Sequence, residues 1–275
     1  MTLSLAFSPC PNDTFIFDAL VHHKIDTAGF DFSVSYLDVQ QLNLDAAIGK
    51  HDITKLSYFA ASRLLDQYQI LSSGGALGFG CGPLLISKKH YALEDVRDLK
   101  IAIPGKNTTA NFLLQYALPG ELHAEEYLFS DIENAVLDGE ADAGLIIHEN
   151  RFTYENKGLQ KIVDLGEYWE KQTGHPIPLG CIAVRRSMDN VLKIQLNNLI
   201  RSSVGYAWQH PESGRDYIKC HSQELEDSVI DAHINLYVNA YSADLGPTGK
   251  KAVLHMFERA GVLPDLLDEK KIFIR

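Results

Sequence analysis

The sequence has few cysteines, and they are spaced far apart. Only four occur among its 275 residues, with no C-x-x-C pair: Cys10, Cys81, Cys181 and Cys220. Structural zinc sites and thiol redox motifs both need closely spaced cysteines, so neither kind of site is indicated. Single, scattered cysteines are typical of reduced thiols in a cytoplasmic protein. We therefore expect no bound metal and no disulfide framework.

The sequence also lacks an excess of positive charge. Its formal net charge is −11, with 25 Lys and Arg against 36 Asp and Glu. This balance argues against nucleic acid or an anionic membrane surface as a partner. An anionic small-molecule substrate stays compatible with it, because a few local donors outweigh distant screened charges.

Long hydrophobic runs are missing as well. No apolar stretch approaches the length of a membrane span. Residues 1–9 lack the basic start and the apolar segment of an export signal. We expect a cytoplasmic protein without a membrane-spanning part.

The most glycine-rich stretch, 72–83, matches no phosphate-binding fingerprint. It contains neither G-x-x-x-x-G-K-[ST] nor a G-x-G-x-x-G that opens a helix. It predicts an irregular segment leading into a strand at 84–87. Its glycines would let the backbone approach another lobe or a ligand closely.

What the sequence does contain is a series of strand-to-helix junctions. The first runs from a strand at 3–7 through a polar turn to a helix at 14–22, with Asn12 or Asp13 as the helix cap. A turn of this kind at a helix N-terminus favours anions. Cys10 lies in the turn, where its thiol is either activated by the helix or merely structural.

The second junction follows a brief strand at 52–56. Ser57 is placed to cap a helix at 58–68, and Lys55 precedes it. A lysine and a hydroxyl here are candidates for ligand contacts. The alternative is a solvated charge and a simple helix cap.

The third junction follows a strand at 100–103. Thr108 or Thr109 is expected to cap a helix at 110–118. The first N–H groups of that helix, around Thr109 and Ala110, would then bind a carboxylate.

A fourth strand, at 143–147, leads to a histidine. Ser130 and Glu133 have the spacing of a capping box, which predicts a helix closed by Gly139 before that strand. His148 then stands at the carboxyl end of the strand, the edge at which α/β sheets bind ligands. An imidazole there is a candidate general base, or only a hydrogen-bonding partner of a neighbouring loop.

These junctions predict an α/β protein of two lobes with parallel sheets and a two-strand hinge. We place lobe 1 at 1–88 and 185–275, and lobe 2 at 89–184. Residues 151–154 and 165–169 are expected to be surface loops. Helices after residue 188 should return to cover lobe 1.

Several motifs resemble a known family. They are SPCPNDTF (8–15), TKLSY (54–58), SGGALG (73–78), PGKNTTA (104–110), IIHENRFTY (146–154) and HINLYVN (233–239). Together they resemble the 1,4-dihydroxy-6-naphthoate synthase family of menaquinone biosynthesis, which belongs to the futalosine route. The overall plan resembles the type II periplasmic-binding-protein fold, in which two α/β lobes close on a small ligand.

The resemblance implies an enzyme that converts cyclic dehypoxanthine futalosine to the naphthoate with loss of a sugar-derived fragment, using no cofactor and no metal. It implies that His148 is the proton acceptor. The substrate contacts that it implies are Lys55, Leu56, Ser57, Thr109 and Ala110. The junctions add Asn12, Thr108 and Arg151, of which Arg151 is expected either to bind an anion or to pair with Glu149.

Two alternatives stay open at this point. A chorismate dehydratase of the same pathway would share the fold and take a carboxylate-bearing substrate. A non-catalytic protein that only captures a carboxylate would share the fold as well, but the missing export signal disfavours it.

Overall fold

The computed structural model describes residues 1–223 and 225–274, and the chain forms two compact units. Unit 1 comprises residues 1–78 and 178–275, and unit 2 comprises residues 79–177. The chain passes from one unit to the other twice. Strands β5 (Ala76–Gly78) and β11 (Ile177–Arg185) lead to these two crossings and pair with each other. The sequence had placed the boundaries somewhat further along, after residues 88 and 184.

Unit 1 is built on a six-stranded sheet. Besides β5 and β11 it contains β1 (Thr2–Phe7), β2 (Asp31–Tyr36), β3 (Ile53–Ser57) and β4 (Tyr68–Ile70). The strand order is β2-β1-β3-β11-β4, with β5 attached to β11. β1 is parallel to both β2 and β3, whereas β11 runs antiparallel to β3 and β4.

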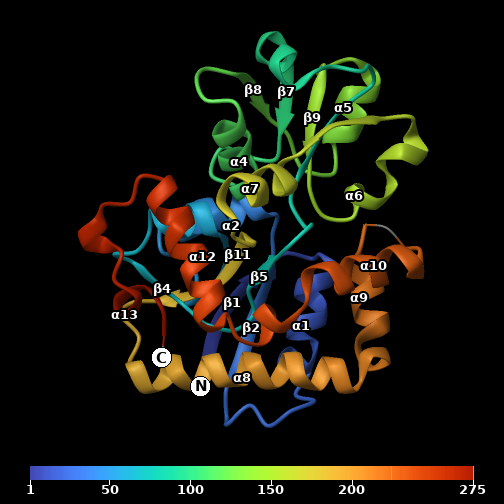
Figure 1. Cartoon of the computed structure of the whole chain (residues 1–275). Helices are drawn as coiled ribbons and strands as arrows, with labels where there is room; N and C mark the ends of the chain where they lie inside the picture. The colour runs from blue at the N-terminus through green and yellow to red at the C-terminus, as the bar shows by residue number, and fades with distance from the viewer. Residues whose placement is uncertain (224, 275) are drawn as a thin grey trace. The chain divides into compact units, whose positions relative to one another are not determined.

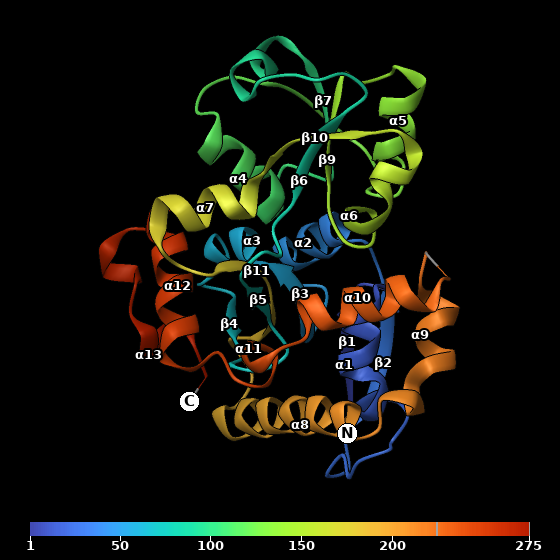
Figure 2. The same ribbon diagram turned by 45° about the vertical axis from the view of Figure 1, so that its right-hand side comes forward.

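The helices of unit 1 come from both ends of the chain. They are α1 (Pro11–Val21), α2 (Val39–Ala47), α3 (Tyr58–Ser62), α8 (Asn190–Gln209), α9 (Arg215–His221), α10 (Asp227–Tyr237), α11 (Ala240–Ala243), α12 (Gly246–Arg259) and α13 (Glu269–Ile272), with 3-10 turns at Pro211–Gly214 and Pro264–Leu266. Alternate residues of β1, such as Leu5 and Phe7, pack in one apolar core with α1, α8 and α10. Figure 2 labels this strand and these helices. Among the helices that the structure describes, none is long and apolar enough to cross a membrane.

Unit 2 is a smaller α/β layer arrangement. Its strands are β6 (Leu84–Ser87), β7 (Lys100–Ile103), β8 (His123–Glu126), β9 (Ala143–Ile146) and β10 (Gln160–Asp164). Its helices are α4 (Thr109–Ala117), α5 (Ile132–Asp138), α6 (Asn150–Thr153) and α7 (Leu165–Thr173), with 3-10 turns at Leu93–Asp98 and Tyr154–Lys157. The strand order is β10-β6-β9-β7-β8, of which the part β9-β7-β8 can be followed in Figure 1.

The two sheets share one topology. In each, a β-α-β-α-β run places its first strand in the middle, which gives β2-β1-β3 in unit 1 and β8-β7-β9 in unit 2. The next strand of each sheet is antiparallel, β11 beside β3 and β6 beside β9. With right-handed crossovers, the two connecting helices of each run lie on opposite faces of the sheet. The carboxyl ends of the parallel strands therefore meet at the point where strand order reverses, and this is where such sheets bind ligands.

Three expectations about secondary structure were wrong. The sheets are mixed rather than parallel, because β11 and β6 each enter after a crossing between units and not through a β-α-β connection. The segments 151–154 and 165–169 are helical, not surface loops, and Trp169 is fully buried. The helix after Ser57 ends at Ser62, well before residue 68.

A close backbone approach in unit 2 yields a test of this packing. A Cβ added to Gly82 would lie 2.3 Å from the Cα of Gly166, and one added to Gly166 would lie 2.7 Å from the Cα of Gly82. We expect Gly82→Ala to lower the free energy of unfolding by about 1–3 kcal/mol, since backbone cannot move aside cheaply. Gly205, inside α8, has nothing within 4 Å of its added Cβ. Gly205→Ala should instead stabilise by up to about 1 kcal/mol through helix propensity. Denaturant unfolding measures both, and equal effects of the two variants would contradict the packing.

Candidate active site

The turn after β1 is organised by a buried carboxylate. Asp13, in the first turn of α1, is 1% exposed. Its Oδ2 accepts from the Ser8 hydroxyl at 2.7 Å and from the Ser8 N–H at 3.3 Å, while its Oδ1 accepts from the Asn12 amide at 2.8 Å. A negative charge here is also favoured by the helix dipole. The sequence had suggested Asn12 or Asp13 as the helix cap. This was wrong, because the helix begins at Pro11 with Cys10 as its cap residue.

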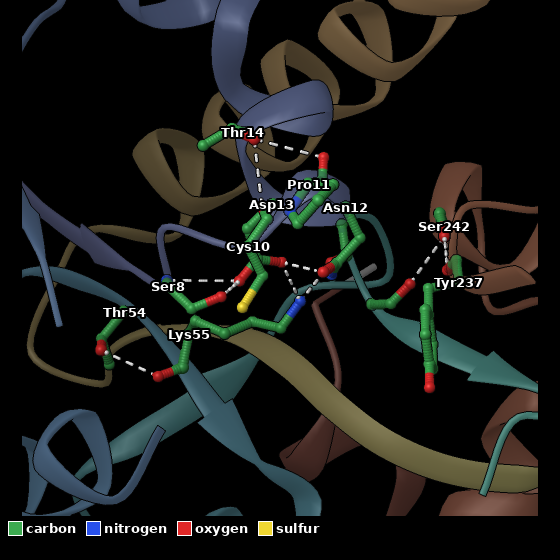
Figure 3. A network of polar contacts seen from close by, with 12 residues as sticks. Ser8, Cys10, Pro11, Asn12, Asp13, Thr14, Thr54, Lys55, Tyr237 and Ser242 are labelled. Atoms are coloured by element: carbon green, nitrogen blue, oxygen red, sulfur yellow. Dashed lines mark hydrogen bonds and ion pairs between the residues drawn. The ribbon is translucent and has the colours of Figure 1, made fainter. Parts of the chain in front are cut away.

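Lys55 reaches this carboxylate from the neighbouring strand. Its ammonium lies 2.6 Å from Asp13 Oδ1, and the side chain is 7% exposed. Figure 3 shows the lysine side chain extending beneath the turn that carries Ser8, Cys10 and Asp13. The alternative of a solvated charge at Lys55 is therefore wrong, because the lysine forms a buried ion pair. Removing one partner of such a pair is costly, since the other charge is left buried alone.

The end of β3 is held by an amide from α2. The Ser57 N–H donates to Asn43 Oδ1 at 3.0 Å, and Asn43 donates back to the Ser57 hydroxyl at 3.2 Å. Ser57 is the N-cap residue of α3, as expected, but its side chain makes no capping hydrogen bond. Its neighbour Leu56 is fully buried, which leaves only its backbone for any contact with a ligand.

In unit 2, the turn after β7 leads into α4 as expected. Thr108 caps this helix: its hydroxyl accepts from the Asn111 N–H at 3.2 Å and donates to the Gly105 carbonyl at 2.7 Å. The first turn of α4 contains no acidic residue. The N–H groups of Thr109 and Ala110 point out of the helix N-terminus, which is the geometry of an anion site.

His148 follows β9, the strand beside β7. It adopts a positive φ of 60°, which turns the chain sharply at the end of the strand. Its ring is partly buried and lies against Phe129, with the centroids 5.1 Å apart. The carboxyl ends of β7, β8 and β9 share one edge of the sheet. His148 therefore lies on the same edge as the N-terminus of α4.

Two buried carboxylates hold the segment after His148. Glu133 accepts from Asn150 at 2.5 Å and from Lys157 at 2.7 Å, and Asp164 accepts from Arg151 at 2.6 Å. Asp164 also caps α7 through two backbone N–H groups. The capping box expected at Ser130 and Glu133 was wrong, because Glu133 is used in these tertiary contacts and the Ser130 hydroxyl donates to Asp131.

Sequence reasoning missed several residues of this arrangement. It treated Asp13 only as a possible helix cap and Glu133 only as part of a capping box, it included His233 only in the HINLYVN motif, and it did not single out Asn43 or Asp164. His233 lies in α10 and its Nε2 is 2.9 Å from Asn12 Oδ1. The partners are 221 residues apart, so no local signal could have revealed the contact.

The fold defines a class of protein first. The chain matches the alkanesulfonate-binding protein of Xanthomonas axonopodis, solved with bound MOPS, with a TM-score of 0.72 at 14% identity over 99% of this chain and 96% of that one. At that identity the likeness shows the fold alone. It is the two-lobed α/β fold of periplasmic binding proteins.

The family is more specific. The menaquinone biosynthesis family matches residues 3–261, and the chain belongs to it. It is 46% identical to the 1,4-dihydroxy-6-naphthoate synthase of Thermus thermophilus, over 94% of this chain and 93% of that protein. The synthase of Streptomyces coelicolor is 43% identical, with 96% of both chains covered. A crystal structure from Archaeoglobus fulgidus has a TM-score of 0.90 at 32% identity, covering 94% of this chain and 97% of that one.

The environments of the four cysteines predict their reactivity. Burial raises the pKa of the Cys81 and Cys181 thiols to about 12, and Cys10 is buried as well. Cys220 is exposed. Since the thiolate is the reactive species, iodoacetamide at pH 8 should modify one thiol rapidly in the native protein. Mass spectrometry should locate that thiol at Cys220, and a rapid phase that survives Cys220→Ser would contradict the assignment.

The positive φ of His148 predicts an unusual order of stability. A side chain in the left-handed region costs about 1 kcal/mol, which glycine avoids. His148→Gly should therefore be as stable as His148→Ala or more stable by up to about 1 kcal/mol, although glycine normally destabilises relative to alanine. Chemical denaturation of the two variants provides the measurement. A markedly less stable glycine variant would show that the backbone there is not left-handed.

Proposed function

We propose that this chain is a 1,4-dihydroxy-6-naphthoate synthase that acts on cyclic dehypoxanthine futalosine. The reaction is an elimination started by a base, in which a carbon–carbon bond breaks and a sugar-derived fragment leaves. Formation of the aromatic ring supplies the driving force, so the proposed reaction uses no redox cofactor and no metal. The scattered cysteines suit a cytoplasmic location.

One observation carries the proposal. A histidine and a helix N-terminus without an acidic residue in its first turn lie at the same ligand-binding edge of one sheet. His148 ends β9, and α4 starts after the neighbouring β7 without an acidic residue in its first turn. A general base beside an anion site is the pair that a carboxylate-bearing, proton-donating substrate needs. The high identity to two synthases supports the same activity.

The proposed roles divide between contact and support. His148 accepts a proton from a ring carbon of the substrate. The N–H groups of Thr109 and Ala110 hold the carboxylate, while Lys55 and Ser57 donate to other substrate oxygens, and the backbone of Leu56 lines the same strand.

Three further candidates are better explained as supports. Asn12 bonds to Asp13 and His233, Thr108 caps α4, and Arg151 pairs with Asp164. Each of these side chains already has partners within its own unit. We propose that they hold the contacting residues in place.

His148→Asn tests the base directly. A general base contributes roughly 10²- to 10⁴-fold to a rate, so we expect kcat to fall by that factor while circular dichroism and Tm stay close to the unmodified protein. The assay follows naphthoate absorbance after addition of cyclic dehypoxanthine futalosine. Chorismate, supplied in parallel, distinguishes the dehydratase alternative.

His123→Asn is the matched control. His123 belongs to the same unit but is largely exposed, with its ring near Glu125. Its replacement should leave kcat unchanged. A His148→Asn variant with nearly normal kcat would remove the proposed base, and tight substrate binding without turnover in the unmodified protein would indicate a carboxylate-binding protein instead.

A further inference from the structure

A line of buried hydrogen bonds runs from α10 to Lys55. His233 is fully buried, and its Nε2 lies 2.9 Å from Asn12 Oδ1. The Asn12 amide nitrogen lies 2.8 Å from Asp13 Oδ1, which in turn lies 2.6 Å from the Lys55 ammonium. All four residues belong to unit 1, and each is less than a tenth exposed.

The direction of these bonds follows from the chemistry of the groups. A carboxylate paired with a lysine accepts only, so the Asn12 side chain must turn its NH₂ toward Asp13. Its carbonyl oxygen then faces His233, and that oxygen needs a donor. His233 must therefore carry its proton on Nε2. The His233 imidazole therefore sets the orientation of the Asn12 amide, and this amide holds Oδ1 of the Asp13 carboxylate.

The Asp13 carboxylate is thereby held on all sides. The Ser8 hydroxyl and N–H hold Oδ2, and Asn12 and Lys55 share Oδ1. The ammonium of Lys55 carries three N–H bonds. Among the described residues, the acceptors of these bonds are Asp13 Oδ1 at 2.6 Å and the Gly74 carbonyl at 3.5 Å. The third N–H bond has no hydrogen-bond acceptor among the described residues.

We propose that Asn12 and His233 are positioning residues for Lys55. They orient the Asp13 carboxylate so that the ammonium presents its third N–H bond to the substrate in one fixed direction. The proposal rests on the proposed function, in which Lys55 contacts the substrate. A lysine has a flexible four-carbon stem, so without this support its ammonium would sample several directions and bind the substrate more weakly.

Four variants test the proposal. Lys55→Met removes the contact itself. His233→Leu removes the donor to Asn12 at similar volume, Asn12→Leu removes both of its bonds, and His233→Gln restores an N–H group near the position of Nε2. Steady-state kinetics give KM and kcat for each variant. Product affinity, from fluorescence titration with 1,4-dihydroxy-6-naphthoate, gives a readout that needs no turnover.

His51→Leu is the matched control. His51 is also buried in unit 1, and its Nε2 is 3.1 Å from Asp45 Oδ2, but this pair is not part of the line that leads to Lys55. Its loss should lower Tm as a buried polar deletion does. It should leave KM and product affinity within twofold.

We expect His233→Leu and Asn12→Leu to raise KM and to weaken product affinity about tenfold, with kcat within threefold. His233→Gln should recover most of that loss. If His233→Leu fails to fold, Asn12→Leu gives the same comparison. Unchanged KM in the leucine variants, with a raised KM in Lys55→Met, would overturn the positioning role and leave the proposed function standing. Unchanged KM and affinity in Lys55→Met would overturn the Lys55 contact and the positioning role together, while the His148→Asn result judges the enzyme activity separately.

Discussion

The central position of the first strand in each sheet is the constraint on which the rest depends. β1 lies between β2 and β3, and β7 lies between β8 and β9. Each central strand therefore ends beside the carboxyl ends of two parallel strands. Turns from distant parts of the sequence are thereby gathered at one edge of each sheet. The turn before α1 meets the end of β3 in unit 1, and the turn before α4 meets the end of β9 in unit 2.

Local signals were sufficient for much of this architecture. The helices after residue 188 belong to unit 1, as expected, and the apolar residues of α8 and α10 pack in one core with β1. The strand before His148, the Gly139 helix end and the Thr108 cap were predicted correctly, since each depends on contacts within a few residues. The strand at 84–87 was predicted as well, but the antiparallel direction of β6 and β11 was not, because it is set by where the chain crosses between units and not by composition.

The capping hydrogen bonds expected of Ser57 and Ser130 are replaced by other contacts, because a polar side chain can bond to several nearby groups. The Ser57 hydroxyl accepts from Asn43, 14 residues away. The Ser130 hydroxyl donates to the adjacent Asp131, and Glu133 accepts from Asn150 and Lys157. The contact of His233 with Asn12 lies beyond any window of local reasoning. The sequence therefore indicated which strand-to-helix turns carry the candidate site residues. The hydrogen bonds that hold these turns in place could be identified only from the structure.

The two helix N-termini at these edges differ in a way that bears on how a substrate is oriented. At α1 the chain supplies its own anion: Asp13 lies in the first turn and is neutralised by Lys55. A second carboxylate there would meet that charge at short range, so the pair suits an uncharged hydroxyl or carbonyl oxygen. At α4 the first turn has no acid, and its N–H groups retain the full preference of a helix N-terminus for negative charge. On the proposed function, the substrate carboxylate therefore belongs with Thr109 and Ala110 rather than with the Asp13–Lys55 pair. On the same proposal, His148 accepts its proton near that carboxylate, because His148 and α4 share one sheet edge.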